Sequence, residues 1–547
     1  MSDISYCVFS GGSACNHIVG AFQRTTPDTV YILGIGDNGG STSELLRVIG
    51  GPSIGDLRSR LTRLINLLPS KMESDPGREE RAAIKTIMSY RLPAEGNEHD
   101  VKDEWSEIVE GRHRLWEPIP VEKKETIRGF LAMFDYEILK RSHKRFNFRN
   151  GSIGNFFLTG ARLFFGSLEA AIFLFSAITG ISEPTSVIPV INTNHTASIA
   201  ALLENGETLK GQCEISHPSP SSQKEQKPLN PIDAFSRLAF PGSPVAENAP
   251  QTNENLVFSK TLEEKLDARI ARIYYMNEFG QEIYPIPSPK VLKHLNTKNV
   301  LVYSIGSLYT SIIPCLILRG VGNAISQSTS LQHKILILNG HNDRETTGYT
   351  ALDFIYAITS ALNESKLVDA RRKFYQHCNN NNTTNGDSHH SQSHSHSQSS
   401  LAMQALKIDV GTPLSSSPLS SNGVDILHPK PTRPQLATKQ RPYLLTPSPA
   451  CSTSTHEGYP ATTAQPAVTG TPPGYPSFPQ DLLSPAPPNA FITTLLFLSN
   501  SEIIVDVEAI KELGIKCLEV RGGVSETGKP IYDDNALRYA LEFAVRS

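Results

Sequence analysis

The sequence predicts an α/β protein with a Rossmann-like, open and mostly parallel sheet that carries helices on both faces. Three observations predict this class. Short apolar runs, typical of strands buried on both faces, alternate with helix-length amphipathic segments. Glycine-rich turns adjoin several of these runs, and serine and threonine cluster in the same turns. Such turns place backbone N–H groups at the carboxyl ends of strands, where open α/β sheets bind nucleotides and phosphorylated ligands.

The first elements form a βαβ unit. Residues 6–9 and 30–35 are apolar runs typical of strands, and residues 14–24 between them carry their apolar side chains on one helical face. Strand, glycine turn, helix and strand in this order are the unit that builds parallel sheets. The next helix is expected over 54–68, where arginines are interleaved with leucines.

Residues 70–146 interrupt the α/β pattern. They are rich in charged residues and contain helical stretches at 78–90 and 122–140, so we expect a helical insertion packed on the core. The pattern resumes with two apolar helices, expected over 154–164 and 168–179.

A hairpin is expected in the middle of the chain. Residues 198–204 and 208–215 flank Asn205-Gly206, and Asn-Gly between two such runs is a strong hairpin signal. Residues 218–255, rich in Pro, Ser and Gln, are expected to form an extended loop.

Further strands and helices complete the predicted sheet. The other apolar runs expected as strands are 187–191, 300–303, 334–340 and 491–498. The other expected helices are 350–362, 507–513 and 535–545, and a helix or an apolar turn is expected over 312–318.

The domain organisation follows from a low-complexity segment. Residues 376–488 are so rich in Asn, Ser, His, Pro and Thr that they cannot bury enough apolar surface to offset the entropy of ordering. We therefore expect one α/β domain, built from 1–375 and 489–547 and interrupted by a long disordered insertion.

The composition excludes several partners. The 51 Lys and Arg residues nearly balance the 54 Asp and Glu residues, which gives no signal for nucleic acid. The longest apolar stretch, 163–181, contains Gly166 and Glu169, so it predicts a buried helix and no membrane span. Seven scattered cysteines without a C-x-x-C pair indicate a reducing compartment, and we expect a cytoplasmic protein.

Residues in and near the glycine-rich turns are the candidate ligand-binding residues. The set consists of Gly11, Gly12, Ser13, Asn38, Gly39, Gly40, Ser41, Asp56, Arg58, Asn155, Gly306, Ser307, Thr310 and Ser311. Asp37 is the only carboxylate inside the second turn, and it is the candidate catalytic residue and metal ligand. A carboxylate at this place can bind a cation or accept a hydrogen bond from a sugar hydroxyl.

Each turn also has a plainer interpretation. Gly11-Gly12 is compatible with a tight turn between strand and helix, and the segment after Asp37 with a turn that caps the next helix. Ser307 and Asn155 are compatible with N-caps. Three such turns at one edge of one sheet favour a phosphorylated ligand over three unrelated caps.

Several motifs in a fixed order resemble the CofD/YvcK family, and more closely its YvcK branch. They are 37–43, 52–58, Gly154-Asn155, Asn205-Gly206, 306–314 and 345–350. The resemblance implies a Rossmann-like fold with a nucleotide-type ligand at the strand ends. In the CofD branch it implies transfer of a phospholactyl group from lactyl-diphosphoguanosine to a deazaflavin alcohol, with a divalent metal. In the YvcK branch it implies a nucleotide-sugar-binding factor that governs carbon metabolism and cell-wall synthesis.

The chain departs from the family pattern at two positions. Asn38 stands where the YvcK-like pattern has a second Asp, and Ser13 stands where Thr is usual. Because Asn is a poorer ligand for a hard cation, the first difference weakens the argument for metal-dependent transfer. Two functions therefore stay open: a phospholactate-type transferase with Mg²⁺ as the expected cofactor, and a non-catalytic nucleotide-sugar-binding regulator. The expected partner is a nucleotide or nucleotide-sugar, with a homodimer as the assembly to test.

Overall fold

The computed structural model describes most of the chain outside two long segments. The described residues are 4–12, 14–65, 77–216, 265–277, 279–384, 476–479, 482 and 484–546, with side chains omitted for 379–384. Ser13, the predicted loop 218–255 and nearly all of the predicted insertion lie outside them. The chain divides into two compact units, one formed by 1–370 with 483–547 and the other by 371–482.

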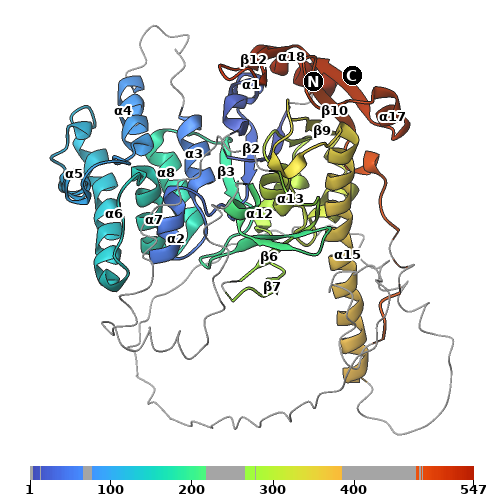
Figure 1. The fold of residues 1–547 in the computed structure, drawn as a ribbon, viewed down its shortest axis with the longest axis horizontal. Helices are drawn as coiled ribbons and strands as arrows, with labels where there is room; N and C mark the ends of the chain where they lie inside the picture. The colour runs from blue at the N-terminus through green and yellow to red at the C-terminus, as the bar shows by residue number, and fades with distance from the viewer. Residues whose placement is uncertain are drawn as a thin grey trace, which may run out of the picture. The chain divides into compact units, whose positions relative to one another are not determined.

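A seven-stranded sheet forms the centre of the first unit (Figure 1). Its order is β11-β10-β9-β8-β1-β2-β3, and every neighbouring pair is parallel. The strands are β1 (Tyr6–Ser10), β2 (Thr29–Leu33), β3 (Ser186–Pro189), β8 (Val300–Tyr303), β9 (His333–Ile337), β10 (Thr494–Leu498) and β11 (Lys516–Val520). All residues of β1, β2 and β8 are buried, as expected for strands covered on both faces. The predicted fold class is confirmed.

The strand order reverses direction between β1 and β8. From β1 the chain moves through β2 to β3, and from β8 it moves through β9 and β10 to the opposite edge. Parallel crossovers are right-handed, so the crossover helices of one half lie on the opposite face of the sheet from those of the other half. Tyr6 pairs with both Thr29 of β2 and Val300 of β8, so these two strands flank the first strand directly. In open α/β sheets, ligands bind at the carboxyl ends of strands where the order reverses.

The helices of these crossovers carry the expected pattern. On the first half they are α1 (Val19–Thr25), α2 (Ser41–Val48) and α3 (Gly55–Leu64). On the second half they include α12 (Pro289–Leu295), α13 (Ile313–Leu316), α14 (Val321–Gln327), α15 (Ala351–Thr384) and α17 (Val507–Glu512). The terminal helix α18 (Asp534–Arg546) packs on α1, while α12 packs on α14. The expected 350–362 helix is therefore too short, because α15 continues beyond the predicted start of the insertion.

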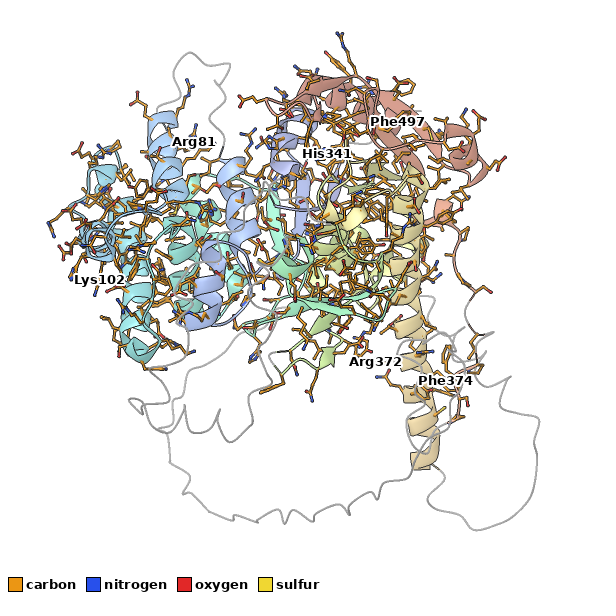
Figure 2. The ribbon with its side chains drawn as sticks, in the orientation of Figure 1. Arg81, Lys102, His341, Arg372, Phe374 and Phe497 are labelled. Carbon is orange, nitrogen blue, oxygen red and sulfur yellow. The ribbon has the colours of Figure 1, made fainter. Side chains whose placement is uncertain are left out.

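The predicted helical insertion lies beside β3 and is more extensive than its two expected stretches. Its helices are α4 (Arg78–Ser89), α5 (Glu98–Glu110) and α6 (Val121–Lys140), followed by α7 (Ile153–Phe165) and α8 (Leu168–Thr179). Figure 2 shows Arg81 on α4 and Lys102 on α5, on the far side of the sheet from Phe497 in β10. Trp105 of the unforeseen α5 stacks on Phe148 and meets Phe134 and Phe156 edge to face, which joins the insertion to α7.

A smaller antiparallel sheet corrects part of the predicted hairpin. Its order is β5-β4-β6-β7, with bounds β4 (Ser198–Leu203), β5 (Thr208–Lys210), β6 (Ile270–Met276) and β7 (Glu282–Ile283). The β4–β5 hairpin is confirmed, but its second strand does not reach residue 215. Gly211, at φ +87°, turns the chain into a short helix, α9 (Gln212–Ser216). This conformation suits glycine and ends the extended run after three residues.

A second hairpin, β12 (Gly522–Val524) with β13 (Pro530–Tyr532), was not predicted, and neither was β11. Among the described residues, no single helix is long and apolar enough to cross a membrane. One sharply bent pair, Leu308–Leu316 with Val321–Gln327, meets that criterion of length and composition when the two segments are taken together.

Candidate functional site

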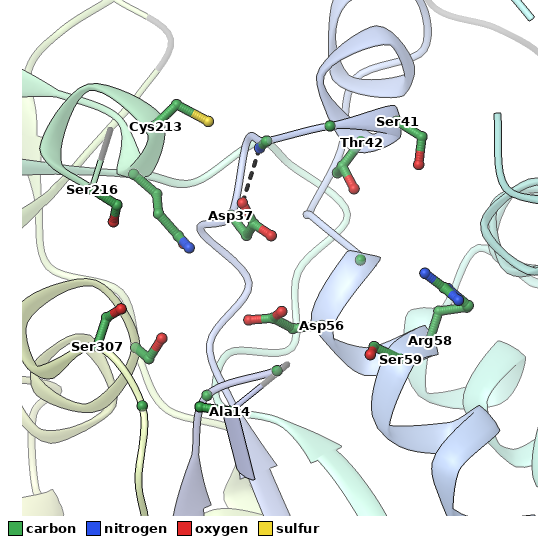
Figure 3. Close-up of a pocket in the computed structure, with 18 of the residues that line it drawn as sticks. Ala14, Asp37, Ser41, Thr42, Asp56, Arg58, Ser59, Cys213, Ser216 and Ser307 are labelled. Carbon is green, nitrogen blue, oxygen red and sulfur yellow. Dashed lines mark hydrogen bonds between the residues drawn. The ribbon is translucent and has the colours of Figure 1, made fainter. Parts of the chain in front are cut away.

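A polar cavity of about 690 Å³ lies at the carboxyl ends of the strands that flank the reversal point (Figure 3). We call it the switch-point cavity. Twelve predicted site residues line it, namely Gly11, Gly12, Asp37, Gly39, Gly40, Ser41, Asp56, Arg58, Asn155, Gly306, Ser307 and Ser311. Residues with no predicted role also line it: Ala14, Thr42, Gly55, Ser59, Arg91, Asn150, Gln212, Cys213, Ser216, Asp343, Arg344 and Glu345. The turns that the sequence placed at one sheet edge therefore surround one cavity.

Two glycine turns meet at the floor of the cavity because β1 and β8 are neighbours. A Cβ built on Gly306, which has φ +152°, lies 3.2 Å from the backbone nitrogen of Gly11. A Cβ on Gly12 lies 1.7 Å from Oδ1 of Asp56, a distance that no real side chain tolerates. Glycine at residue 12 therefore lets the Asp56 carboxylate reach the turn.

The Asp37 turn holds its carboxylate by a local hydrogen bond. The backbone N–H of Gly39 donates to Oδ1 of Asp37 at 2.9 Å, which is drawn in Figure 3. Helix α2 has Gly40 as its N-cap, without a side-chain cap. The turn that follows Asp37 therefore leads directly into this helix, as the plainer interpretation of the segment expected. Asp37 closes the turn with one oxygen, and its other oxygen, Oδ2, lies 3.7 Å from the position of a Cβ on Gly55.

Asn38 and Thr310 were predicted to bind ligand, but they do not line the cavity. Oδ1 of Asn38 accepts a hydrogen bond from the backbone N–H of Cys213 at 3.0 Å, so the side chain anchors α9. The Thr310 hydroxyl donates to Oε1 of Glu345 at 2.6 Å. Neighbouring residues in a turn point in different directions, so Asn at residue 38 removes no carboxylate from the cavity wall. The family difference at this position therefore carries less weight than the sequence alone indicated.

Asp56 is an unusual carboxyl group. It projects from the first turn of α3 toward the centre of the cavity, opposite Asp37 (Figure 3). Burial first, and then the nearby charge of Asp37, raise the pKa of Asp56 to about 7. Arg60, the backbone N–H of Gly12 and Arg58 oppose these effects on the pKa. Proximity of two carboxylates is a common feature of sites that bind a cation or move a proton.

A basic flank stands on one side of this acidic centre. Nε of Arg58 donates to Oδ1 of Asn155 at 3.3 Å, and Nδ2 of Asn155 donates to the Ser41 hydroxyl at 3.1 Å. Arg91 donates to the same hydroxyl at 3.2 Å. Gly154 leaves room for the Arg58 stem, because a Cβ there would lie 3.0 Å from Cδ of Arg58. Asn155 thus links two parts of the site and is not an N-cap.

Glu345 closes the opposite side of the cavity. It is 3% exposed and accepts hydrogen bonds from the hydroxyls of Ser216 and Thr310, at 2.7 and 2.6 Å, and from the backbone N–H groups of Tyr309 and Thr310. Burial first, and then the charge of Asp343, raise the pKa of Glu345 to about 7, while the hydrogen bonds from Ser216 and Thr310 oppose the rise. The motif 345–350 was the one sequence signal for this residue, and no role had been assigned to it.

Cys213 lines the cavity but is not a nucleophile. Burial, and then the charge of Asp37, raises the pKa of the Cys213 thiol to about 12, so the thiol stays protonated at neutral pH. A thiolate is the reactive form of cysteine. The sequence did not predict that Cys213 and its neighbours in α9 line the cavity, because this segment was expected to be a strand.

The residues present suit a magnesium ion that is shared with a ligand. No group of three or more His, Cys, Asp or Glu residues within the described ranges is arranged to hold a metal by itself. Mg²⁺ usually binds through one or two carboxylates and completes its shell with waters and substrate phosphates. The Asp37 and Asp56 pair meets that requirement, and a cation beside it relieves the repulsion that raises the pKa of Asp56.

Fold and site together define an α/β protein with a polar cavity at the reversal point of a Rossmann-like sheet. A family model described as 2-phospho-L-lactate transferase CofD matches residues 7–410, which is most of the chain. The chain belongs to the CofD family. The predicted family resemblance is confirmed.

Relatives and structures give further similarities. The uncharacterized protein YNL011C of Saccharomyces cerevisiae is 38% identical over 384 residues, which are 65% of this chain and 83% of that protein. A gluconeogenesis factor of Halalkalibacterium halodurans is 41% identical over 73 residues, 13% of this chain and 22% of that protein. The crystal structure of protein BH3568 from Bacillus halodurans has a TM-score of 0.49 and 14% identity, over 99% of this chain and 100% of that chain.

Proposed function

We propose that this protein is a phospholactate-type transferase that acts on a nucleotide-activated substrate, with activity similar to 2-phospho-L-lactate transferase. The observation that carries the proposal is the pair of carboxylates, Asp37 and Asp56, on the wall of a cavity floored by glycine turns. Family membership supports the reaction type. The position of the cavity at the reversal point supports a nucleotide-linked ligand.

The reaction is a displacement at phosphorus. A hydroxyl oxygen of the deazaflavin alcohol forms a bond to the phosphorus that carries the lactyl group in lactyl-diphosphoguanosine. The bond from that phosphorus to the oxygen bridging the two phosphates breaks, and guanosine monophosphate leaves. The hydroxyl proton passes to the Asp56 carboxylate, which projects toward the centre of the cavity (Figure 3).

Asp37 is proposed to hold Mg²⁺ together with the phosphates of the ligand. When bound, such an ion neutralises charge on the phosphate oxygens during transfer. The chain itself orients Asp37 through the Gly39 N–H, so the carboxylate is in place before the ligand arrives.

The test is release of guanosine monophosphate from lactyl-diphosphoguanosine with Mg²⁺ and a deazaflavin alcohol present. We expect turnover that stops when Mg²⁺ is chelated and falls at least 100-fold in Asp56→Asn, in line with the usual contribution of a general base. Absence of product with every deazaflavin acceptor would refute this reaction.

A second candidate is a nucleotide-sugar-binding regulator without chemistry. It is supported by the local similarity to the gluconeogenesis factor of Halalkalibacterium halodurans. Calorimetric titration with UDP-sugars, GDP and NAD(P) separates the two candidates. Binding of a UDP-sugar without turnover of any nucleotide-linked donor favours the regulator, whereas absence of binding to all these compounds excludes it.

Location and assembly are part of the same proposal. We place the protein in the cytoplasm, because the six cysteines within the described ranges are free thiols. We propose a homodimer as its assembly. Cell fractionation tests the location, and sedimentation of the purified chain tests the dimer.

A further inference from the structure

Two arginines at the basic flank of the switch-point cavity lack carboxylate partners. Arg58 is half-buried and Arg91 is exposed at the cavity rim. Their hydrogen bonds go to neutral groups: Arg58 donates to Asn155, and Arg91 donates to the Ser41 hydroxyl and to the carbonyl oxygen of Asn150. Among the ion pairs between described residues, none involves either arginine.

Arg272 shows how this chain treats a similarly enclosed arginine elsewhere. Its guanidinium forms ion pairs with both Glu282 and Glu364, so the positive charge is compensated within the protein. The two arginines at the cavity instead repel each other. Burial first, and then the charge of Arg91, lower the pKa of Arg58 to about 10, so this side chain remains protonated at neutral pH. The Asp56 carboxylate offsets part of this charge at Arg58, but among the described residues no ion pair neutralises either guanidinium, which favours binding of an anion.

The main chain places Arg91 firmly. Arg91 forms an antiparallel bridge with Ser152. The N–H of Leu92 donates to the carbonyl of Gly151, and the N–H of Ile153 donates to the carbonyl of Tyr90. The end of α4 is thereby joined to the start of α7, the helix that carries Asn155. An arginine from the helical insertion is thus fixed at the same cavity as one from the α/β core.

We infer that Arg58 and Arg91 form an anion subsite that binds a phosphate or diphosphate group of the ligand. The inference rests on the proposed function for the ligand class. It adds that the helical insertion supplies one half of the phosphate-binding machinery. Arginine suits this role because its planar group can donate two parallel hydrogen bonds to phosphate oxygens. The Asn155 amide, which contacts Arg58 and Ser41, positions the two halves of the subsite.

Inorganic pyrophosphate is the probe, titrated calorimetrically into the full chain in low-salt buffer with EDTA. We expect saturable binding to the wild type and a loss of roughly 10- to 100-fold in affinity in Arg91→Gln and in Arg58→Gln, the usual effect of losing charge-assisted hydrogen bonds. Arg112→Gln is the matched control, because Arg112 lies in the same insertion, outside the cavity lining, and pairs with Glu110. Its affinity should equal that of the wild type.

Further arms separate this inference from the transferase proposal. Without metal, Asp37→Asn should bind pyrophosphate at least as tightly as the wild type, because one repelling charge is gone. GDP should depend on both arginines, whereas guanosine should not. No saturable pyrophosphate binding by the wild type, or Arg91→Gln within twofold of it, overturns the subsite. If Arg91→Gln lowers the melting temperature strongly, the pyrophosphate affinity of Arg58→Gln is the result that supports or overturns the subsite. If the wild type binds pyrophosphate but shows no transfer activity, the transferase proposal is refuted and the anion subsite is still supported.

Discussion

Replacing Asp37 by Asn tests whether this carboxylate binds the ligand through its charge. The substitution keeps the size of the side chain, and the amide oxygen can still accept the hydrogen bond from the Gly39 N–H, which is 2.9 Å long in the wild type. The turn should therefore stay intact. The charge that faces Asp56 disappears, so the pKa of Asp56 should fall from its raised value.

The expected loss concerns ligand affinity and not stability. Removing a charged partner of a bound cation or hydroxyl costs about 1–3 kcal/mol, which corresponds to roughly 5- to 150-fold in the dissociation constant of GDP with Mg²⁺. The free energy of unfolding at pH 8 should stay equal or rise slightly, because the repulsion between Asp37 and Asp56 is gone. Calorimetric titration measures the first quantity, and urea denaturation measures the second.

Asn38→Asp is the matched control for this experiment. It adds a carboxylate one residue away, but the side chain of residue 38 accepts a hydrogen bond from the Cys213 N–H and does not line the cavity. The affinity for GDP with Mg²⁺ should therefore change less than twofold. Unaltered affinity in Asp37→Asn would refute the assignment of Asp37, and a large gain in Asn38→Asp would refute the orientation of the turn.

Three more predictions follow from the site and the chain. Gly12→Ala should displace the Asp56 carboxylate, because the new Cβ would lie 1.7 Å from it; we expect a stability loss of about 1–3 kcal/mol and weaker GDP binding, measured by denaturation and calorimetry. Glu345, with a pKa raised to about 7, makes the folded state bind more protons than the unfolded state, so its contribution to stability is present at low pH and is lost as pH rises toward 7. In the wild type, the free energy of unfolding should therefore fall between pH 5 and pH 8, and Glu345→Gln should remove up to about 3 kcal/mol of this fall. Melting temperatures measured across this pH range test the prediction, and an equal pH dependence in wild type and variant contradicts it. Deleting residues 385–475 should leave the melting temperature nearly unchanged, since loop-closure entropy grows slowly with length, and a large drop would show that the segment stabilises the fold.

Local patterns in the sequence were sufficient for six of the seven strands of the main sheet and for half of the residues that line the cavity. The apolar runs at 6–9, 30–35 and 300–303 became fully buried parallel strands, because strands covered by helices on both faces need apolar side chains on both sides. The glycine turns at the strand ends were also predictable from the sequence. Glycine is needed there because only a residue without a side chain allows the close approach of backbone and carboxylate that is seen at Gly12.

Other features required contacts between segments that are distant in the sequence. Arg91 belongs to an insertion whose charged composition resembles any exposed helix, and only the pairing with Ser152 brings it to the cavity. Helix α9 was expected as a strand because Cys213 and Ile215 alternate with polar residues, and the turn at Gly211 changed the period. The direction of the Asn38 side chain depends on the α9 backbone that it meets.

The fold class, the burial of the strands and the edge of the sheet at which glycine-rich turns gather follow from the sequence, because they depend on residue type and period along one segment. The position of β8 beside β1 is a property of the folded protein, and it brings Gly306 within reach of Gly11 across nearly three hundred residues. The tertiary structure also decided which polar side chains face the cavity and which anchor a neighbouring segment. Strand order and side-chain direction depend on packing between distant segments, and local sequence patterns do not specify that packing.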